Sequence, residues 1–246
     1  MRISAIVLAK NEEKNIKECL KSVAFCDEVL VIDDNSQDST REIAKEMGAK
    51  VFVHALKGNF SAQRNFALEK ARGEWVLFID ADERVSEALA SEIFNFQFSI
   101  SNFNGFYLKR KDVMWGRELR HGEVGNVRLL RLARKGSGTW KRRVHEYWDV
   151  KGKIEELKNP LFHYPHQTLS EFIQDIDFYS TLHAQQKKDD NEHSSIVKII
   201  LWPAAKFARN WIIRGGFLDG IQGLVHASLM SFHSFLSWSK LWLIEH

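Results

Sequence analysis

The chain has 246 residues, of which 44% are hydrophobic and 27% charged, and its formal net charge is +3. This composition excludes a disordered, collagen-like or low-complexity chain and predicts one large domain or two small ones. The two cysteines, Cys19 and Cys26, are too few for a disulfide scaffold or a four-cysteine zinc site, and they fit a reducing compartment.

Positive charge is concentrated in the middle of the chain. Residues 107–153 hold 14 Lys and Arg against 5 Asp and Glu, a net charge of +9, whereas residues 1–106 have a net charge of −4. Because a basic cleft concentrates anionic ligands, we expect this block to meet phosphates or an anionic acceptor; a solvated basic face is the plainer alternative. No nucleic-acid-binding motif accompanies the block, so nucleic acid is not an expected partner.

The first hundred residues alternate short apolar runs with longer helical patterns. We expect strands at 3–9, 29–32, 51–53 and 75–79, and helices at 11–20, 40–47, 61–71 and 86–96. This alternation predicts an α/β fold with a mostly parallel sheet flanked by helices. Further on we expect strands and loops at 106–115 and 127–148, a helix at 169–187 and a polar linker at 187–195. An amphipathic helical tail follows from Ile196, interrupted at Pro203 and at Gly215 and Gly216.

Carboxylates follow two of the expected strands. Asp33 and Asp34 come directly after residues 29–32, and Asp80 and Asp82 come after residues 75–79. Ligands of open α/β sheets bind at the carboxyl ends of the strands. Two carboxylates at positions i and i+2 of an extended chain can lie on one side of it, and such a pair suits Mg²⁺ or Mn²⁺ together with a diphosphate. The alternative is structural, because a single Asp at the end of a strand more often forms a turn or caps a helix.

The segment after the first acidic pair has a structural interpretation as well. Asp33 or Asp34 can accept hydrogen bonds from a nucleobase or a ribose. Asp38 or Ser39 can cap the next helix, with Glu42 in a capping-box position.

Several motifs in register resemble the opening of family 2 glycosyltransferases. They are Lys10-Asn11-Glu12, residues 31–40, Gly58, Arg64-Asn65, Ala71, Gly73-Glu74 and residues 78–82. The resemblance implies a GT-A fold, a nucleotide-sugar donor, Mg²⁺ or Mn²⁺, and inversion at the sugar carbon. Carried over by position, Lys10, Asn11, Asp33 and Asp34 would line the nucleoside pocket and Arg64 would lie near the diphosphate. Asp80 and Asp82 would bind the metal and the diphosphate.

An inverting transfer needs a base that takes the proton from the acceptor hydroxyl. Glu123 precedes a strand-like segment in a position that resembles the acidic residue of related enzymes, although their usual Asp is not evident. Glu146 is the second candidate, and His145 beside it would orient Glu146 or contact a metal. A salt bridge to neighbouring arginines is the structural alternative for either Glu.

The tail carries four of the eight tryptophans, and Ile196, Ile199, Ile200, Phe207 and Trp211 form a stripe beside basic residues. This pattern fits an interfacial helix or packing against the catalytic domain, and the tail is too polar for a confident transmembrane helix. Residues 214–220 and 240–242 resemble the tail of bacterial lipopolysaccharide inner-core β-1,4-glucosyltransferases.

These patterns and the resemblance together predict a catalytic domain over residues 1–188 and a helical tail over 189–246. Within the domain, residues 1–98 would bind the nucleotide and 99–188 the acceptor. The implied enzyme is a peripheral protein on the inner face of the cytoplasmic membrane that moves glucose from UDP-glucose to a core heptose on an anionic, lipid-anchored acceptor. A polyprenyl-phosphate glycosyltransferase and a non-catalytic membrane adaptor that keeps the fold are the alternatives.

Overall fold

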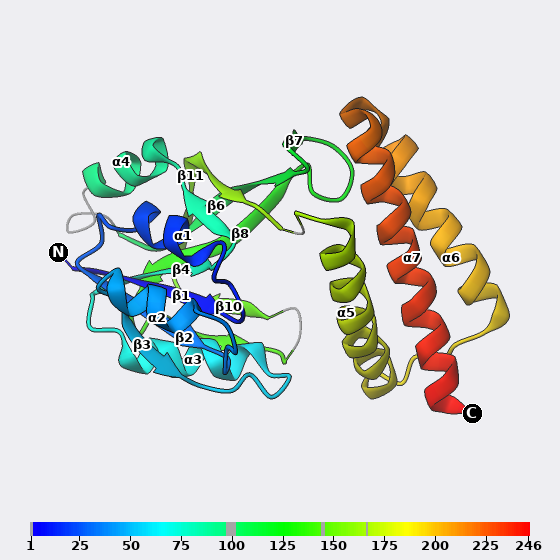
Figure 1. Cartoon of the computed structure of the whole chain (residues 1–246), viewed down its shortest axis with the longest axis horizontal. Coiled ribbons are helices and arrows are strands. Elements are labelled where there is room, and N and C mark those ends of the chain that lie inside the picture. The colour runs from blue at the N-terminus through cyan, green and yellow to red at the C-terminus, as the bar shows by residue number, and fades with distance from the viewer. Residues whose placement is uncertain (1, 97–101, 144–145, 166) are drawn as a thin grey trace. The chain divides into compact units, whose positions relative to one another are not determined.

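A computed structural model describes residues 2–96, 102–143, 146–165 and 167–246 (Figure 1). By packing, the chain divides into two compact units. Unit 1 comprises residues 1–110 and 127–163, and unit 2 comprises residues 111–126 and 164–246.

Unit 1 is built on one sheet with the strand order β3-β2-β1-β4-β8-β6-β11-β5. Its strands are β1 (Ile3–Ala9), β2 (Glu28–Asp33), β3 (Lys50–Val53), β4 (Trp75–Asp80), β5 (Glu83–Val85), β6 (Phe103–Met114), β8 (Val127–Arg134) and β11 (Lys153–His163), with a separate hairpin of β9 (Gly138–Lys141) and β10 (Tyr147–Val150). Its helices are α1 (Ile16–Ser22), α2 (Thr40–Glu46), α3 (Phe60–Lys70) and α4 (Glu87–Asn95). Strands β3, β2, β1 and β4 are parallel, whereas β8, β6 and β5 join by antiparallel pairs. The predicted α/β sheet flanked by helices is confirmed.

The central strands are apolar on both sides because helices or the β9–β10 hairpin cover both faces of the sheet. Along β4, Trp75, Leu77 and Ile79 enter one core cluster, while Val76 and Phe78 enter the other. Successive side chains of a strand point to opposite faces, so a continuous apolar run is what a doubly covered strand requires.

The first helix is shorter than predicted: α1 begins at Ile16 and not at Asn11. Asn11 has a left-handed φ of 54°, and its amide donates to Ser36 Oγ at 2.9 Å. The amides of Glu12 and Glu13 donate to side chains of Thr40 and Asp38. These donors are therefore used by the neighbouring loop, and the helix starts only after them.

The predicted capping box before α2 does not form. Ser39 occupies the N-cap position without a side-chain hydrogen bond to the helix. Asp38 accepts instead from the amides of Glu13 and Thr40, so it ties two loops together and has the structural role that was expected of it.

Unit 2 contains β7 (Arg117–Leu119), which pairs with the end of β6, and a set of helices: α5 (Leu169–Asp189), α6 (Ile196–Ala208), the π-helix η1 (Arg209–Ile213), the 3₁₀-helix η2 (Gly216–Asp219) and α7 (Gly220–Glu245). Helix α7 lies between α5 and α6 (Figure 1). Ala184 of α5 packs with Trp238 and Leu241 of α7. Because α5 packs against the tail, the division into compact units does not fall at the predicted boundary, residue 188. The functional assignment of residues 1–188 as the catalytic domain stays a prediction.

Pro203 does not interrupt the tail as predicted, because α6 continues through it to Ala208. Pro203 is buried, and its carbonyl accepts a hydrogen bond from Ser231 Oγ of α7 at 2.8 Å. Packing on α7 thus outweighs the cost of proline inside the helix. The break at Gly215 is confirmed, since this residue has a left-handed φ of 69° after η1.

Candidate active site

The two acidic strand ends lie on either side of β1. In the parallel register, Ala9 of β1 pairs with Asp33 of β2, and Leu8 pairs with Asp80 of β4. Neighbouring strands of a sheet are about 4.8 Å apart, so the two carboxylates stand two strands from each other at one carboxyl edge. The sheet therefore places at one carboxyl edge two groups that are 47 positions apart in the sequence.

Asp33 is fully buried, and one of its oxygens is bonded to the protein. Oδ2 accepts from the Ser36 amide at 3.0 Å. Among the described residues, none donates to Oδ1. Because a buried polar atom without a partner is costly, this oxygen is suited to a donor on a ligand, such as a base N–H or a ribose hydroxyl.

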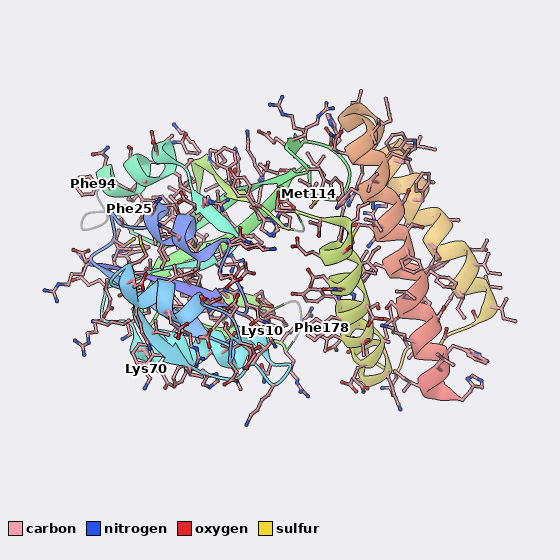
Figure 2. The ribbon with its side chains drawn as sticks, viewed as in Figure 1. Lys10, Phe25, Lys70, Phe94, Met114 and Phe178 are labelled. Atoms are coloured by element: carbon pink, nitrogen blue, oxygen red, sulfur yellow. The ribbon has the colours of Figure 1, made fainter. Side chains whose placement is uncertain are left out.

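Asp34 is bonded to two neighbouring segments. Its Oδ1 accepts from the Leu56 amide at 2.7 Å, and its Oδ2 lies 2.9 Å from Lys10 Nζ. Lys10 follows the end of β1 and is largely exposed (Figure 2). Asn11 Oδ1 accepts from the Gln37 amide at 2.8 Å. Lys10, Asn11 and Asp34 thus lie together beside Asp33; that they line a nucleoside pocket stays a prediction.

Asp80 is held between two arginines. Arg64 Nη2 donates to Asp80 Oδ1 at 3.0 Å, and Arg131 donates to Oδ2. Burial opposes the ionised form, but the two guanidiniums outweigh it and hold the pKa of Asp80 well below its usual range. Glu83 is buried beside them, accepts from the Asp80 amide at 2.9 Å, and has its pKa raised by burial.

Arg64 occupies the centre of this cluster. It extends from α3, which begins after Asn59 with a side-chain cap on the Ala62 amide. Its guanidinium carbon lies 4.7 Å from the ring centre of Trp140, and its Nε donates to Glu146 Oε1 at 2.9 Å. The structure therefore joins three predicted site residues, Arg64, Asp80 and Glu146. Glu146 therefore forms a salt bridge with an arginine, which was the alternative to its role as the catalytic base.

Asp82 contacts a histidine that the sequence reasoning missed. His163 Nε2 lies 3.1 Å from Asp82 Oδ2, and the histidine ends β11 opposite Glu83 of β5. Burial raises the pKa of Asp82, but the contact with His163 outweighs it, so the pKa is lowered. Arg131 was also missed as a site residue. Both residues lie in or at the end of a strand, Arg131 in β8 and His163 in β11. The sequence did not show which strands β8 and β11 pair with, so it did not show which carboxylates the two residues would meet.

Glu123 belongs to unit 2, and its contacts come from the tail. Lys206 Nζ lies 3.1 Å from Oε1, and Asn210 Nδ2 donates to Oε2 at 3.1 Å. Burial opposes ionisation, yet Lys206 and Asn210 lower the pKa of Glu123. The carboxylate is thus ionised at neutral pH, as a general base must be. His145, the remaining candidate, lies outside the described residues.

Comparison with known proteins agrees with this geometry. Residues 4–97 match the family model described as "Glycosyl transferase family 2". The chain is 27% identical over 247 residues to the "Lipopolysaccharide core biosynthesis glycosyltransferase LpsC" of Rhizobium meliloti (strain 1021), covering 98% of this chain and 92% of the relative. It is 29% identical over 258 residues to the "Uncharacterized glycosyltransferase RT0209" of Rickettsia typhi (strain ATCC VR-144 / Wilmington), covering 98% and 86%.

Among solved structures, S. aureus TarS 1–349 matches with a TM-score of 0.50 and 17% identity, over 100% of this chain and 90% of that one. This likeness concerns the fold. The fold and the acidic strand ends, with these likenesses, define a glycosyltransferase. The chain is therefore an enzyme of the glycosyltransferase class, and residues 4–97 are the part that matches glycosyltransferase family 2.

Proposed function

We propose that the protein is an inverting, metal-dependent enzyme that transfers glucose from UDP-glucose to a heptose of the lipopolysaccharide inner core. The observation that carries the donor half of this proposal is the pair of acidic strand ends beside β1, with two arginines around Asp80. The acceptor half is supported by likeness to LpsC, whose name refers to lipopolysaccharide core biosynthesis, over 98% of this chain.

The donor would bind along the carboxyl edge of the sheet. Asp33 Oδ1 would accept from the base or the ribose, and Asp34, Lys10 and Asn11 would complete this end of the pocket. Arg64 would meet the diphosphate, because its fork of donors suits phosphate oxygens and its position is fixed by Asp80 and Glu146.

The proposal places a divalent cation at the next residues along this edge. Asp82 and His163 offer an oxygen and a nitrogen in contact, and Asp80 is close enough to influence the pKa of Asp82. Within the described ranges, no group of three His, Cys, Asp or Glu side chains is arranged to hold a metal ion. We propose that Asp80 and Asp82 hold Mg²⁺ or Mn²⁺ with the donor diphosphate and that His163 adds a ligand. The ion would neutralise the charge of the leaving diphosphate.

Glu123 is proposed as the base that removes the acceptor proton. Its contacts with Lys206 and Asn210 keep it ionised and fix its two oxygens in place. Glu146 is the second candidate, but its bond to Arg64 favours a positioning role in donor binding.

The acceptor is proposed to be an anionic saccharide on a lipid anchor. The net charge of +9 over residues 107–153 supports an anionic acceptor. The enzyme would then work at the inner face of the cytoplasmic membrane as a peripheral protein. Across the part of the chain that the structure describes, no helix is both long and apolar enough to span a bilayer.

Transfer assays test this proposal directly. Purified enzyme would be incubated with labelled UDP-glucose, UDP-galactose or UDP-N-acetylglucosamine, and with either heptose-terminated core lipid or polyprenyl phosphate. We expect glucose on the core lipid with an inverted anomeric centre, activity lost with EDTA, and recovery with Mg²⁺ or Mn²⁺. Transfer to polyprenyl phosphate alone would select the rival enzyme. Absence of metal-dependent UDP binding in calorimetry would contradict the donor site itself.

A further inference from the structure

One face of α6 and η1 is apolar and exposed along its whole length. The exposed positions recur at helical spacing, in pairs four residues apart. They are Ile196, Val197, Ile200, Leu201, Ala204, Ala205, Ile212 and Ile213. Ile200 is 61% exposed and Ile213 is 80% exposed, so these side chains are directed away from the core of unit 2.

This exposed face is not the face that packs on α7. Ile199 packs against the cluster of Ala184, Trp238 and Leu241, and Pro203 is buried beneath Ser231. Ile199, Phe207 and Trp211 belong to the apolar stripe predicted from the sequence, but all three are partly buried. The helix therefore has two apolar faces, one used by the fold and one without a partner in unit 2.

The exposed charged side chains beside this face are the cations Arg209 and Arg214. Lys198 and Lys206 are instead turned to the packed side, where they contact Trp238 and Glu123. The one carboxylate between residues 196 and 244 is Asp219. Asp219 is buried and accepts from the amides of Arg120 and His121, so it adds no exposed negative charge. Arg209 and Arg214 are exposed beside Ile212 and Ile213.

We propose that the α6–η1 face, defined as the eight residues above with Arg209 and Arg214, lies in the plane of an anionic lipid bilayer. Exposed apolar side chains flanked by cations are what a helix at a lipid interface requires. This inference deepens the proposed function, on whose membrane location it rests.

The same helix holds the candidate base on its other side. Lys206 and Asn210 bind Glu123, and the Arg214 carbonyl accepts from the Gly122 amide at 3.0 Å. Docking of the α6–η1 face would thus orient the loop that carries Glu123 with respect to the lipid surface. If the acceptor is anchored in the same membrane, the membrane surface would limit the orientations in which the acceptor hydroxyl and Glu123 meet, which would favour proton transfer.

Vesicle sedimentation without any sugar substrate tests this inference separately from the chemistry. We expect the full chain to bind phosphatidylcholine vesicles containing phosphatidylglycerol, and to bind pure phosphatidylcholine vesicles weakly. Ile200→Glu and Ile213→Glu should each reduce partitioning about tenfold or more, because each places a charge where an isoleucine would be buried. Arg209→Glu with Arg214→Glu should remove the preference for anionic vesicles.

Phe94→Glu is the matched control, since Phe94 is 74% exposed on α4 of unit 1, at its outer edge (Figure 2). Circular dichroism would verify that every variant is folded. The inference is overturned if the wild-type chain ignores anionic vesicles or if Phe94→Glu weakens binding as much as Ile213→Glu. It is also overturned if light scattering shows a dimer that Ile213→Glu separates. A wild-type chain that does not bind anionic vesicles but still transfers sugar to a lipid-free acceptor would overturn the docking surface and leave the proposed function standing.

Discussion

Arg64 donates to Asp80 at 3.0 Å from a side chain that is almost entirely buried. The same guanidinium donates to Glu146, so one arginine fixes two carboxylates that are 66 positions apart in the chain. Stacking on Trp140 leaves the guanidinium little freedom to rotate. This part of the candidate site is therefore held rigidly by the protein itself, which would favour binding of the proposed donor diphosphate.

Replacing Arg64 should affect both stability and donor binding. Arg64→Ala removes the arginine bound to Glu146 and one of the two arginines bound to Asp80, so we expect about 3 kcal/mol less unfolding free energy in urea. The specificity constant kcat/KM for the UDP-sugar should fall about 100-fold. Arg64→Lys should recover little, because an ammonium cannot bond both carboxylates in a fork.

Arg128→Ala is the matched comparison for Arg64, because Arg128 forms an exposed ion pair with Glu156 on the same sheet. It should cost less than about 1 kcal/mol and leave the donor KM unchanged. An Arg64→Ala enzyme with wild-type donor KM would contradict the proposed diphosphate contact.

The two glutamate candidates should differ in which kinetic constant they change. At saturating donor, Glu123→Gln should lower kcat by about 100-fold to 10,000-fold, because the amide cannot accept the acceptor proton. Glu146→Gln should mainly weaken UDP affinity in calorimetry, because it loosens Arg64. If both variants retain near wild-type kcat, neither residue is the base.

Glu28 should make the fold sensitive to acid. Burial opposes its ionised form, but hydrogen bonds from Lys50, Ser4 and the Arg72 amide lower its pKa to about 2. An unfolded glutamate titrates near pH 4.3, so the carboxylate stabilises the fold fully above that pH. The contribution is lost as pH falls from about 4.3 through about 2.

Glu28→Gln tests the direction of this pH dependence of stability. Relative to wild type it should destabilise the protein on the order of 2 kcal/mol at pH 7, and the difference should shrink towards zero near pH 2. Urea unfolding at several pH values measures it. Glu46→Gln, at an exposed position of α2, should change stability by less than about 0.5 kcal/mol at each pH. A constant difference for Glu28→Gln across this range would show that its charge contributes nothing.

The local sequence indicated most of the helices and strands over residues 1–98 and the strand ends that form the candidate donor site. Apolar runs such as residues 75–79 are strands because both faces of the sheet are covered, and an Asp at the end of each run lies at the carboxyl edge. Where local signals misled, side chains from other segments were responsible. The side chains of Thr40 and Asp38 delay α1, and packing on α7 keeps Pro203 within α6.

Only the tertiary structure decided which charges meet. His163 reaches Asp82 because β11 pairs antiparallel with β5, and Glu146 reaches Arg64 from a segment 82 residues away. Strand pairing across the sheet has no local signature, since it depends on which edges remain for later strands. Likewise, the sequence showed that the tail is amphipathic, but which apolar face packs on α7 and which stays exposed followed from helix packing alone.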